Sequence, residues 1–200
     1  MKQRRRQRRT IKQNHEKKQK EASKMSPFEM TEEFHKTFDP TRPPYPQAFS
    51  AEKAQFRAGF KIEELVEFLY AASNNDEETF QAGLEHLHQA IDQAQAKLAA
   101  KQQPVSDSLV EQVDALCDLL YFTYGSFSLL GVDPAPILAI VHDANMGKLF
   151  PDGQPHYDPE THKVMKPSDW EERFAPEPRI KAEIKRQLAQ KQAQAQESSE

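Results

Sequence analysis

The stretch Lys61-Ile62-Glu63-Glu64-Leu65-Val66-Glu67-Phe68-Leu69-Tyr70 places three carboxylates among apolar residues at helical spacing. Glu63 and Glu67 are four residues apart and Glu64 and Glu67 are three apart, so all three side chains project from one side of a helix. Like charges at these spacings repel each other, so the helix loses stability unless a cation or a basic partner lies between them. A metal site on this helix is therefore a serious candidate.

A second pair of carboxylates lies in the most apolar segment of the chain, residues 107–130. Asp114 and Asp118 are four residues apart there, and Glu111 could extend the same face. Because an ionised carboxylate buried without partners is very costly, the pair needs a cation, a hydrogen-bond donor or a neutral state. The alternative is an acidic first turn that favours the helix macrodipole, which suits Glu111 but not Asp118 farther along the helix.

Charge divides the 200-residue chain into two parts of opposite sign. Residues 1–24 carry eleven Lys or Arg against Glu16 and Glu21, a net charge of +9, whereas the remainder has a net charge of −13. We expect a disordered basic arm, because it has no apolar periodicity to bury. It could be a solvated tail, an arm that binds RNA or another polyanion, or an artefact of an upstream start, with Met25 or Met30 beginning the domain. The acidic remainder can hold divalent cations.

The single cysteine, Cys117, excludes an internal disulfide framework and fits a reducing cytoplasm. No run approaches the roughly 18 apolar residues that a membrane span needs. The positive N-terminus has no apolar segment after it, so it does not resemble a secretory signal. The sequence therefore predicts a cytoplasmic protein with no membrane partner.

Helix-capping residues and helix-terminating Pro, Gly and Asn residues predict an all-α chain. We expect an arm at 1–24, one domain at 25–175 and a polar, helical or disordered tail at 176–200. The predicted helices are a short one at 28–38, four that form a bundle at 51–73, 77–101, 107–130 and from 133 to about 148, and a weaker polar one near 178–194. The segment 107–130 is apolar nearly all round, so its helix is central in the bundle or covered by another subunit.

A basic and polar segment follows the carboxylates along the chain. It comprises Val141-His142-Asp143-Ala144-Asn145-Met146-Gly147-Lys148, and Lys163 and Lys166 come after it. The three lysines could bind phosphates as point charges or be ordinary solvated lysines. Asn145 could orient a substrate or cap the helix end, and a structural role is the more frequent one for a histidine such as His142. Carboxylates from two antiparallel helices suit Mg²⁺, whose waters a polyphosphate can replace.

Four ordered motifs give the chain a family resemblance over about residues 28–175. They are Glu63-Glu64-Leu65-Val66-Glu67, the segment from Asp114 to Gly125, the segment from Val141 to Lys148, and Lys163-Val164-Met165-Lys166-Pro167. Together they resemble the all-α nucleoside triphosphate pyrophosphohydrolase superfamily, which includes MazG-like, dimeric dUTPase-like and phosphoribosyl-ATP pyrophosphohydrolase-like proteins. The resemblance implies a four-helix MazG-like core, a homodimer or dimer of dimers, and hydrolysis of a nucleoside triphosphate to the monophosphate and pyrophosphate.

The resemblance also implies roles for individual residues. Mg²⁺, with Mn²⁺ as an alternative, would be held by Glu64, Glu67, Asp114 and Asp118. Glu63 and Glu64 would be the catalytic carboxylates, with Glu63 as a ligand or general base. Substrate would contact Asn145, Lys148, Lys163 and Lys166, and aromatic residues such as Phe34, Phe38 or Phe60 could contact the base.

Two positions depart from the commoner family pattern. Ala115 stands where a Glu usually precedes Asp118 by three residues, so Asp114 would have to take over as a ligand. His162 stands before Lys163, where relatives often carry Gly. The base recognised by the enzyme stays open, with phosphoribosyl-ATP, dUTP and non-standard nucleotides as candidates.

Two other functions compete with the hydrolase. Glu85-His86-Leu87-His88 contains one Glu-x-x-His, but a di-iron or di-manganese bundle needs two such pairs. Alternatively, the bundle is a non-catalytic dimeric scaffold that binds RNA or another polyanion through the basic arm, and Ala115 then marks lost activity.

Overall fold

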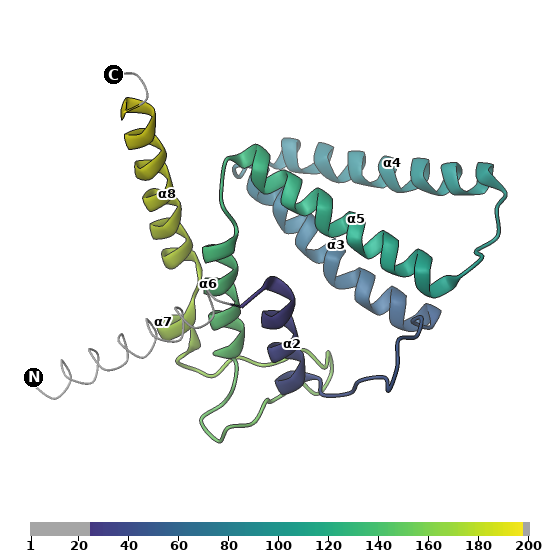
Figure 1. Cartoon of the computed structure of the whole chain (residues 1–200), viewed down its shortest axis with the longest axis horizontal. Coiled ribbons are helices and arrows are strands. Elements are labelled where there is room, and N and C mark those ends of the chain that lie inside the picture. Colours follow the sequence, from purple (N-terminus) through teal and green to yellow (C-terminus); the bar gives the residue numbers. More distant parts are fainter. Residues whose placement is uncertain (1–24, 198–200) are drawn as a thin grey trace, which may run out of the picture. The chain divides into compact units, whose positions relative to one another are not determined.

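The computed structural model describes residues 25–197, which form helices joined by loops (Figure 1). The helices are α2 (Pro27–Phe38), α3 (Ala51–Ser73), α4 (Glu77–Lys101), α5 (Ser108–Leu130), α6 (Ala135–Met146), α7 (Trp170–Phe174) and α8 (Glu177–Glu197). Within the described residues, extended pairing is limited to one isolated antiparallel bridge between Tyr157 and Val164. The predicted all-α class is confirmed. The basic arm predicted at 1–24 lies outside the described residues.

Local signals fix the ends of the long helices. The side chains of Ser50 and Asp76 accept hydrogen bonds from the N–H groups three residues later, at 3.3 Å and 2.8 Å, and begin α3 and α4. Asp107 accepts bonds from two N–H groups at the start of α5. Asn74 at φ 51° and Gly131 at φ 70° end α3 and α5 in the left-handed conformation that stops helices.

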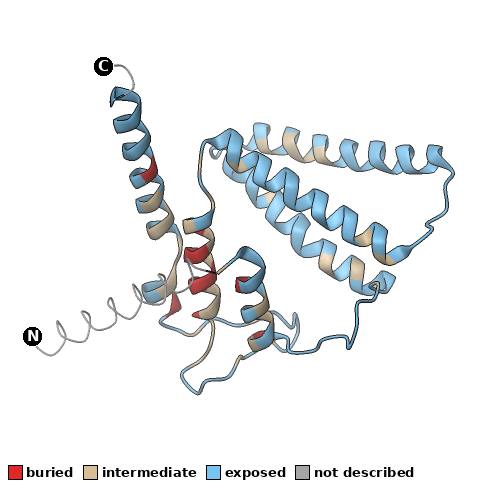
Figure 2. Cartoon of the chain, viewed as in Figure 1, coloured by how far each residue is buried: buried red, intermediate tan, exposed pale blue. Residues whose placement is uncertain are grey.

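The core of one compact unit is built around α6. The described part of this unit comprises residues 25–42 and 120–197. Ala139 and Ile140 are almost fully buried, and Met30 and Phe38 of α2 are buried in the same unit (Figure 2). Because every apolar residue of α6 after Ala135 is buried or half-buried, this short helix forms the centre of its unit.

The other compact unit, Pro43–Leu119, buries far less of its apolar surface. In it α3 and α4 form a helical hairpin, and the rings of Tyr70 and Phe80 pack edge to face, 5.2 Å apart, beside the connecting turn. The two helices diverge away from this turn (Figure 1), and Ile91 and Leu98 of α4 are exposed. The domain boundaries expected at 25–175 and 176–200 stay a prediction.

Within the described residues, no single helix is both long enough and apolar enough to cross a membrane.

Candidate active site

The carboxylates of α3 all reach solvent. Glu63, Glu64 and Glu67 are exposed, as their helical spacing predicts for one side of α3. Lys61 begins this stretch but donates a hydrogen bond to the carbonyl of Arg57 at 3.0 Å. Partial burial, together with the positive charge of Arg57, lowers the pKa of Lys61. The lysine next to the acidic residues is thus engaged by the preceding helical turn.

The second acidic pair, Asp114 and Asp118, is also exposed on α5. Glu111 has a different role from these two residues, because its Oε1 accepts a hydrogen bond from the N–H of Ser106 at 2.9 Å. This contact lies at the start of α5, so the structure favours a local role for Glu111 in the first turn of the helix over an extension of the acidic face. Beside it, Gln112 bonds both backbone groups of Phe49 at 2.9 Å and 3.2 Å, which ties the start of α5 to the residues before α3.

The donor set fits a hard divalent cation by its chemistry. Glu64, Glu67, Asp114 and Asp118 offer only oxygen ligands, and none of the four forms an ion pair with another described residue. Among residues 25–197, however, no three His, Cys, Asp or Glu side chains lie close enough together to hold one ion. The assignment of these residues as ligands therefore stays a prediction that rests on donor chemistry and on the family resemblance.

The polar segment predicted at 141–148 forms the end of α6, and neighbours in the same unit hold it on several sides. His142 is buried, and its Nε2 lies 3.0 Å from Oε2 of Glu33 on α2, so the structural role expected for a histidine is present. The indole N–H of Trp170 donates to the carbonyl of Ala144 at 2.9 Å. A Cβ on Gly147 would lie 2.4 Å from ring atoms of Phe174, so this position accepts only glycine without movement.

Asn145 and Lys148, two of the four predicted substrate-binding residues, are half-buried at this end of α6. Lys163 and Lys166 lie on a separate loop that folds back on itself. The N–H of Asp158 donates to the carbonyl of Lys163 at 2.9 Å, and His162 takes φ 55° at the turn. The left-handed backbone at His162 explains why glycine is the more natural residue there.

The loop turn is stabilised by Asp158. Its Oδ1 accepts hydrogen bonds from the N–H of Thr161 at 2.7 Å, from the Thr161 hydroxyl and from the N–H of Glu160. These bonds, those from Thr161 foremost, hold the pKa of Asp158 below its ordinary value. The loop is also anchored to α2, because the Tyr157 hydroxyl donates to the carbonyl of Phe38 at 2.6 Å.

Lys166 and the predicted base-contacting aromatic residues have other neighbours in the structure. The Nζ of Lys166 lies 3.8 Å from the ring centroid of Trp170, a cation–π contact. Phe38 is buried and stacks on Phe34 with ring centroids 4.5 Å apart, so these two rings contribute to the core of their unit. The structure does not support a base-stacking role for Phe38. Phe60 remains exposed on α3.

A cavity of about 580 Å³ lies against the end of α6. Its lining includes Glu33, His142, Gly147, Arg173 and Phe174. Three residues that the sequence did not point to contact the segment 142–144, namely Glu33, Trp170 and Arg179. Of these three residues, only Trp170 could have been suspected from the sequence, because it is the single Trp of the chain and a buried indole N–H needs a hydrogen-bond acceptor.

Comparison with known proteins agrees with this architecture. Residues 31–145 match the phosphoribosyl-ATP pyrophosphohydrolase family. No curated protein matches the chain. Among solved structures, the chain is similar to one described as a "putative NTP pyrophosphohydrolase" from Exiguobacterium sp. 255-15, with 39% sequence identity and a TM-score of 0.75, over 84% of this chain and 98% of that chain.

The family match spans more than half of the chain, from α2 to the end of α6, and so includes both acidic helices and the segment with Asn145. The family and the solved structure both support pyrophosphohydrolase activity in general. The chain therefore belongs to the phosphoribosyl-ATP pyrophosphohydrolase family, within the MazG-like all-α pyrophosphohydrolases.

Proposed function

We propose that this protein hydrolyses a nucleoside triphosphate, or a related substrate such as phosphoribosyl-ATP, to the monophosphate and pyrophosphate. The observation that supports it most is the set of carboxylates on α3 and α5. Glu64, Glu67, Asp114 and Asp118 are exposed and form no ion pair within the described residues, so a bound cation would relieve the repulsion between neighbouring carboxylates. A chain that only needed a stable bundle would gain from replacing or pairing them.

In the proposed site the carboxylates divide into two roles. Glu64, Glu67, Asp114 and Asp118 would hold Mg²⁺, or Mn²⁺ in its place, and Glu63 would take a proton from the attacking water. The metal, when bound, would offset the negative charge that develops on the triphosphate oxygens. Water oxygen forms a bond to the α-phosphorus while the bond from that phosphorus to the bridging oxygen breaks, and the electron pair leaves with pyrophosphate.

Asn145, Lys148, Lys163 and Lys166 would bind the phosphates and orient them for this attack. Positioning and electrostatic stabilisation supply most of the catalysis in phosphoryl transfer, so these residues contribute through charge and placement. The cation–π contact of Lys166 with the Trp170 ring, 3.8 Å from Nζ to the ring centroid, would favour one placement of the ammonium group in this role. We further propose that the reaction takes place in the cytoplasm and serves to remove unwanted nucleotides from the pool.

The decisive experiment follows pyrophosphate release from a panel of standard and damaged nucleoside triphosphates and phosphoribosyl-ATP, with and without Mg²⁺. Wild-type protein should release pyrophosphate only with the metal, and Glu64→Gln should lower the rate by about 100-fold or more, as loss of an essential charged group does. Glu52→Gln, also on α3 but in its first turn, is the matched control and should keep wild-type activity. No turnover of any substrate would reject the hydrolase in favour of the non-catalytic scaffold, and Ala115 would then mark lost activity.

We propose that the active form is a homodimer or a dimer of dimers. Most apolar side chains of α5 are exposed, among them Tyr121 at 77% and Phe122 at 70%. Soluble monomers rarely expose a continuous apolar surface of this kind, so a second copy is the simplest cover. Sedimentation at micromolar concentration tests this proposal, and a monomer under those conditions would reject it.

A further inference from the structure

One residue of the polar segment of α6 is a buried carboxylate whose partner comes from the C-terminal helix. Asp143 is 6% exposed, and its Oδ2 lies 2.7 Å from Nη1 of Arg179 in the first turn of α8. The Arg179 side chain is itself three-quarters buried. A buried carboxylate requires a partner of this kind, since removing one member leaves an uncompensated charge. The contact therefore joins the start of α8 to a residue two positions before Asn145.

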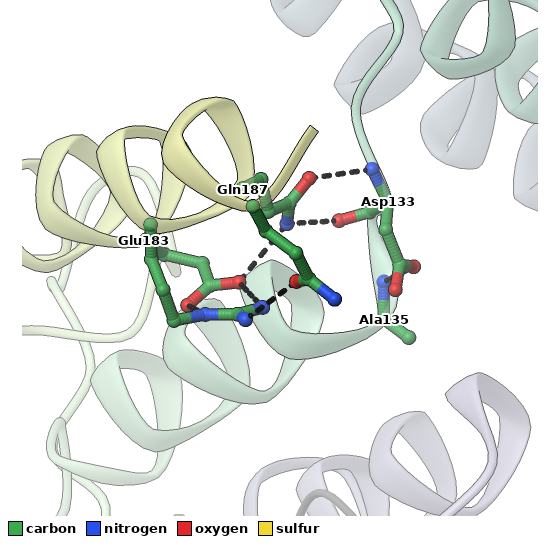
Figure 3. Close-up of polar contacts among 6 residues, drawn as sticks. Asp133, Ala135, Glu183 and Gln187 are labelled. Atoms are coloured by element: carbon green, nitrogen blue, oxygen red, sulfur yellow. Dashed lines mark hydrogen bonds and ion pairs between the residues drawn. The ribbon is translucent and has the colours of Figure 1, made fainter. Parts of the chain in front are cut away.

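The same helix also holds the other end of α6, as Figure 3 shows. Gln187 is buried, and its side-chain amide forms both bonds to the backbone of Asp133: Oε1 accepts from the N–H at 2.8 Å, and Nε2 donates to the carbonyl at 3.0 Å. Lys191 donates to the carbonyl of Gly131, which ends α5. Asp133 in turn accepts a bond from the N–H of Ala135 at 3.0 Å and so begins α6.

The Gln187 side chain is itself oriented by α8. Its Nε2 also donates to Oε1 of Glu183 at 3.0 Å (Figure 3). Arg186 donates to both oxygens of that carboxylate, at 2.7 Å and 2.8 Å. These bonds hold the pKa of Glu183 below its ordinary value, with the bond from Arg186 as the main cause. An amide fixed in this way has little freedom left, so α8 contacts both the start of α6 and its buried carboxylate through preoriented groups.

We propose that α8 positions the phosphate-binding end of α6, with Arg179 and Gln187 as positioning residues. The inference rests on the proposed function in one respect, namely that Asn145 and Lys148 contact the phosphates. Asp143 lies between the start of α6 and these residues on a short, buried helix. Contacts of α8 near both ends would restrain sliding and rotation of α6, and with them the positions of Asn145 and Lys148.

The geometry of Arg179 supplies a sharp test by substitution. Only Nη1 bonds Asp143, while Nη2 is buried and has no hydrogen-bond partner within the described residues. A lysine can replace this single charged contact, whereas a methionine has a similar volume without charge. Arg179→Met should therefore disturb α6, and Arg179→Lys should restore it. Lys185→Met removes one positive charge from an exposed position of α8 and is the matched control.

We would measure kcat and KM for pyrophosphate release with these three variants, together with amide hydrogen exchange over residues 142–149. Arg179→Met should raise KM by about 10-fold with kcat within about 3-fold, because binding geometry is lost before chemistry. Exchange at 142–149 should quicken by about 10-fold in the same variant, since local opening governs it. Arg179→Lys and Lys185→Met should stay near wild type in both measurements.

Two results would overturn the proposal. One is unchanged exchange at 142–149 in Arg179→Met, since α8 would then not hold the end of α6. The other is an equal fall of kcat and kcat/KM that follows the loss of melting temperature in every variant, which would indicate a purely structural contact. The double variant Asp143→Asn with Arg179→Met removes both charges, and recovery of slow exchange in it would support the pair.

The two proposals fail in distinguishable ways. If wild-type protein releases no pyrophosphate, the proposed function is rejected, while the exchange arm still decides whether α8 restrains α6. If wild-type protein is active and Arg179→Met has wild-type kinetics and exchange, the positioning role is rejected and the hydrolase stands.

Discussion

The helices α6 and α5 are both strongly apolar, yet the chain covers one of them and leaves the other bare. In α6, Ala139 and Ile140 are at most 2% exposed, because α2, α7 and α8 supply partners from both ends of the sequence. In α5, Leu129 is 92% exposed. An apolar composition favours burial of a helix, but whether the helix is buried within one chain depends on packing partners from the rest of the sequence. We propose that a second copy of the chain covers α5.

The largest expected effect comes from placing charges on the bare helix. Phe122 and Leu129 lie on one face of α5, seven residues apart, and both are well exposed. Phe122→Lys with Leu129→Lys removes little packing within the chain, so any large effect must act through a partner. We expect the dimer dissociation constant in sedimentation to rise by about 100-fold or more, since two buried charges at an apolar interface are costly.

A matched control separates this effect from charge alone. Gln192→Lys adds a positive charge on the exposed surface of α8 and should leave self-association unchanged. A dimer that survives the double lysine variant would show that α5 is covered in some other way or remains bare in solution.

A pair of isoleucines compares the buried core of α6 with the exposed surface of α4. Ile140→Ala removes a side chain that is 2% exposed, and we expect a loss of about 2–5 kcal/mol in the free energy of unfolding, as for other large-to-small changes in a core. Ile91→Ala on α4 removes one that is 49% exposed and should cost less than about 1 kcal/mol. Urea unfolding of both variants measures the difference. A cost for Ile91→Ala close to that for Ile140→Ala would mean that a partner buries α4 in solution.

Glycine-to-alanine substitutions should have opposite effects on stability after α6, at Gly147, and within α3, at Gly59. At Gly147 the added Cβ would lie 2.4 Å from the ring of Phe174, and we expect a destabilisation of about 1–3 kcal/mol from overpacking. At Gly59 in α3, no heavy atom lies within 4 Å of the added Cβ, so the helix should gain about 0.5–1 kcal/mol. Calorimetry should show a lower melting temperature for Gly147→Ala and a higher one for Gly59→Ala. Destabilisation by Gly59→Ala would locate a tight dimer contact at this point of α3.

The sequence predicts features set by neighbouring residues, such as helix ends, but not contacts between residues far apart in the chain. Ser50, Asp76 and Gly131 act on neighbouring backbone groups, so the ends of the long helices could be read from single residues. The bond between Arg179 and Asp143 joins residues 36 positions apart, and no periodic pattern in the sequence predicts such a contact. The candidate carboxylates could be found by their helical spacing, but their ligand geometry depends on how whole helices pack.

The smallest expected effect concerns a strained turn in the well-covered unit. His162 is exposed and adopts φ 55°, a conformation that costs a non-glycine residue about 1 kcal/mol or more. His162→Gly should raise the free energy of unfolding by less than about 1 kcal/mol, because the freedom of glycine in the unfolded chain offsets part of the gain. His162→Ala keeps the strain and serves as the control, with no gain expected. If the glycine variant is less stable than the alanine variant, the left-handed backbone is not what limits this turn, and the histidine at this departure from the family pattern is retained for contacts of its side chain.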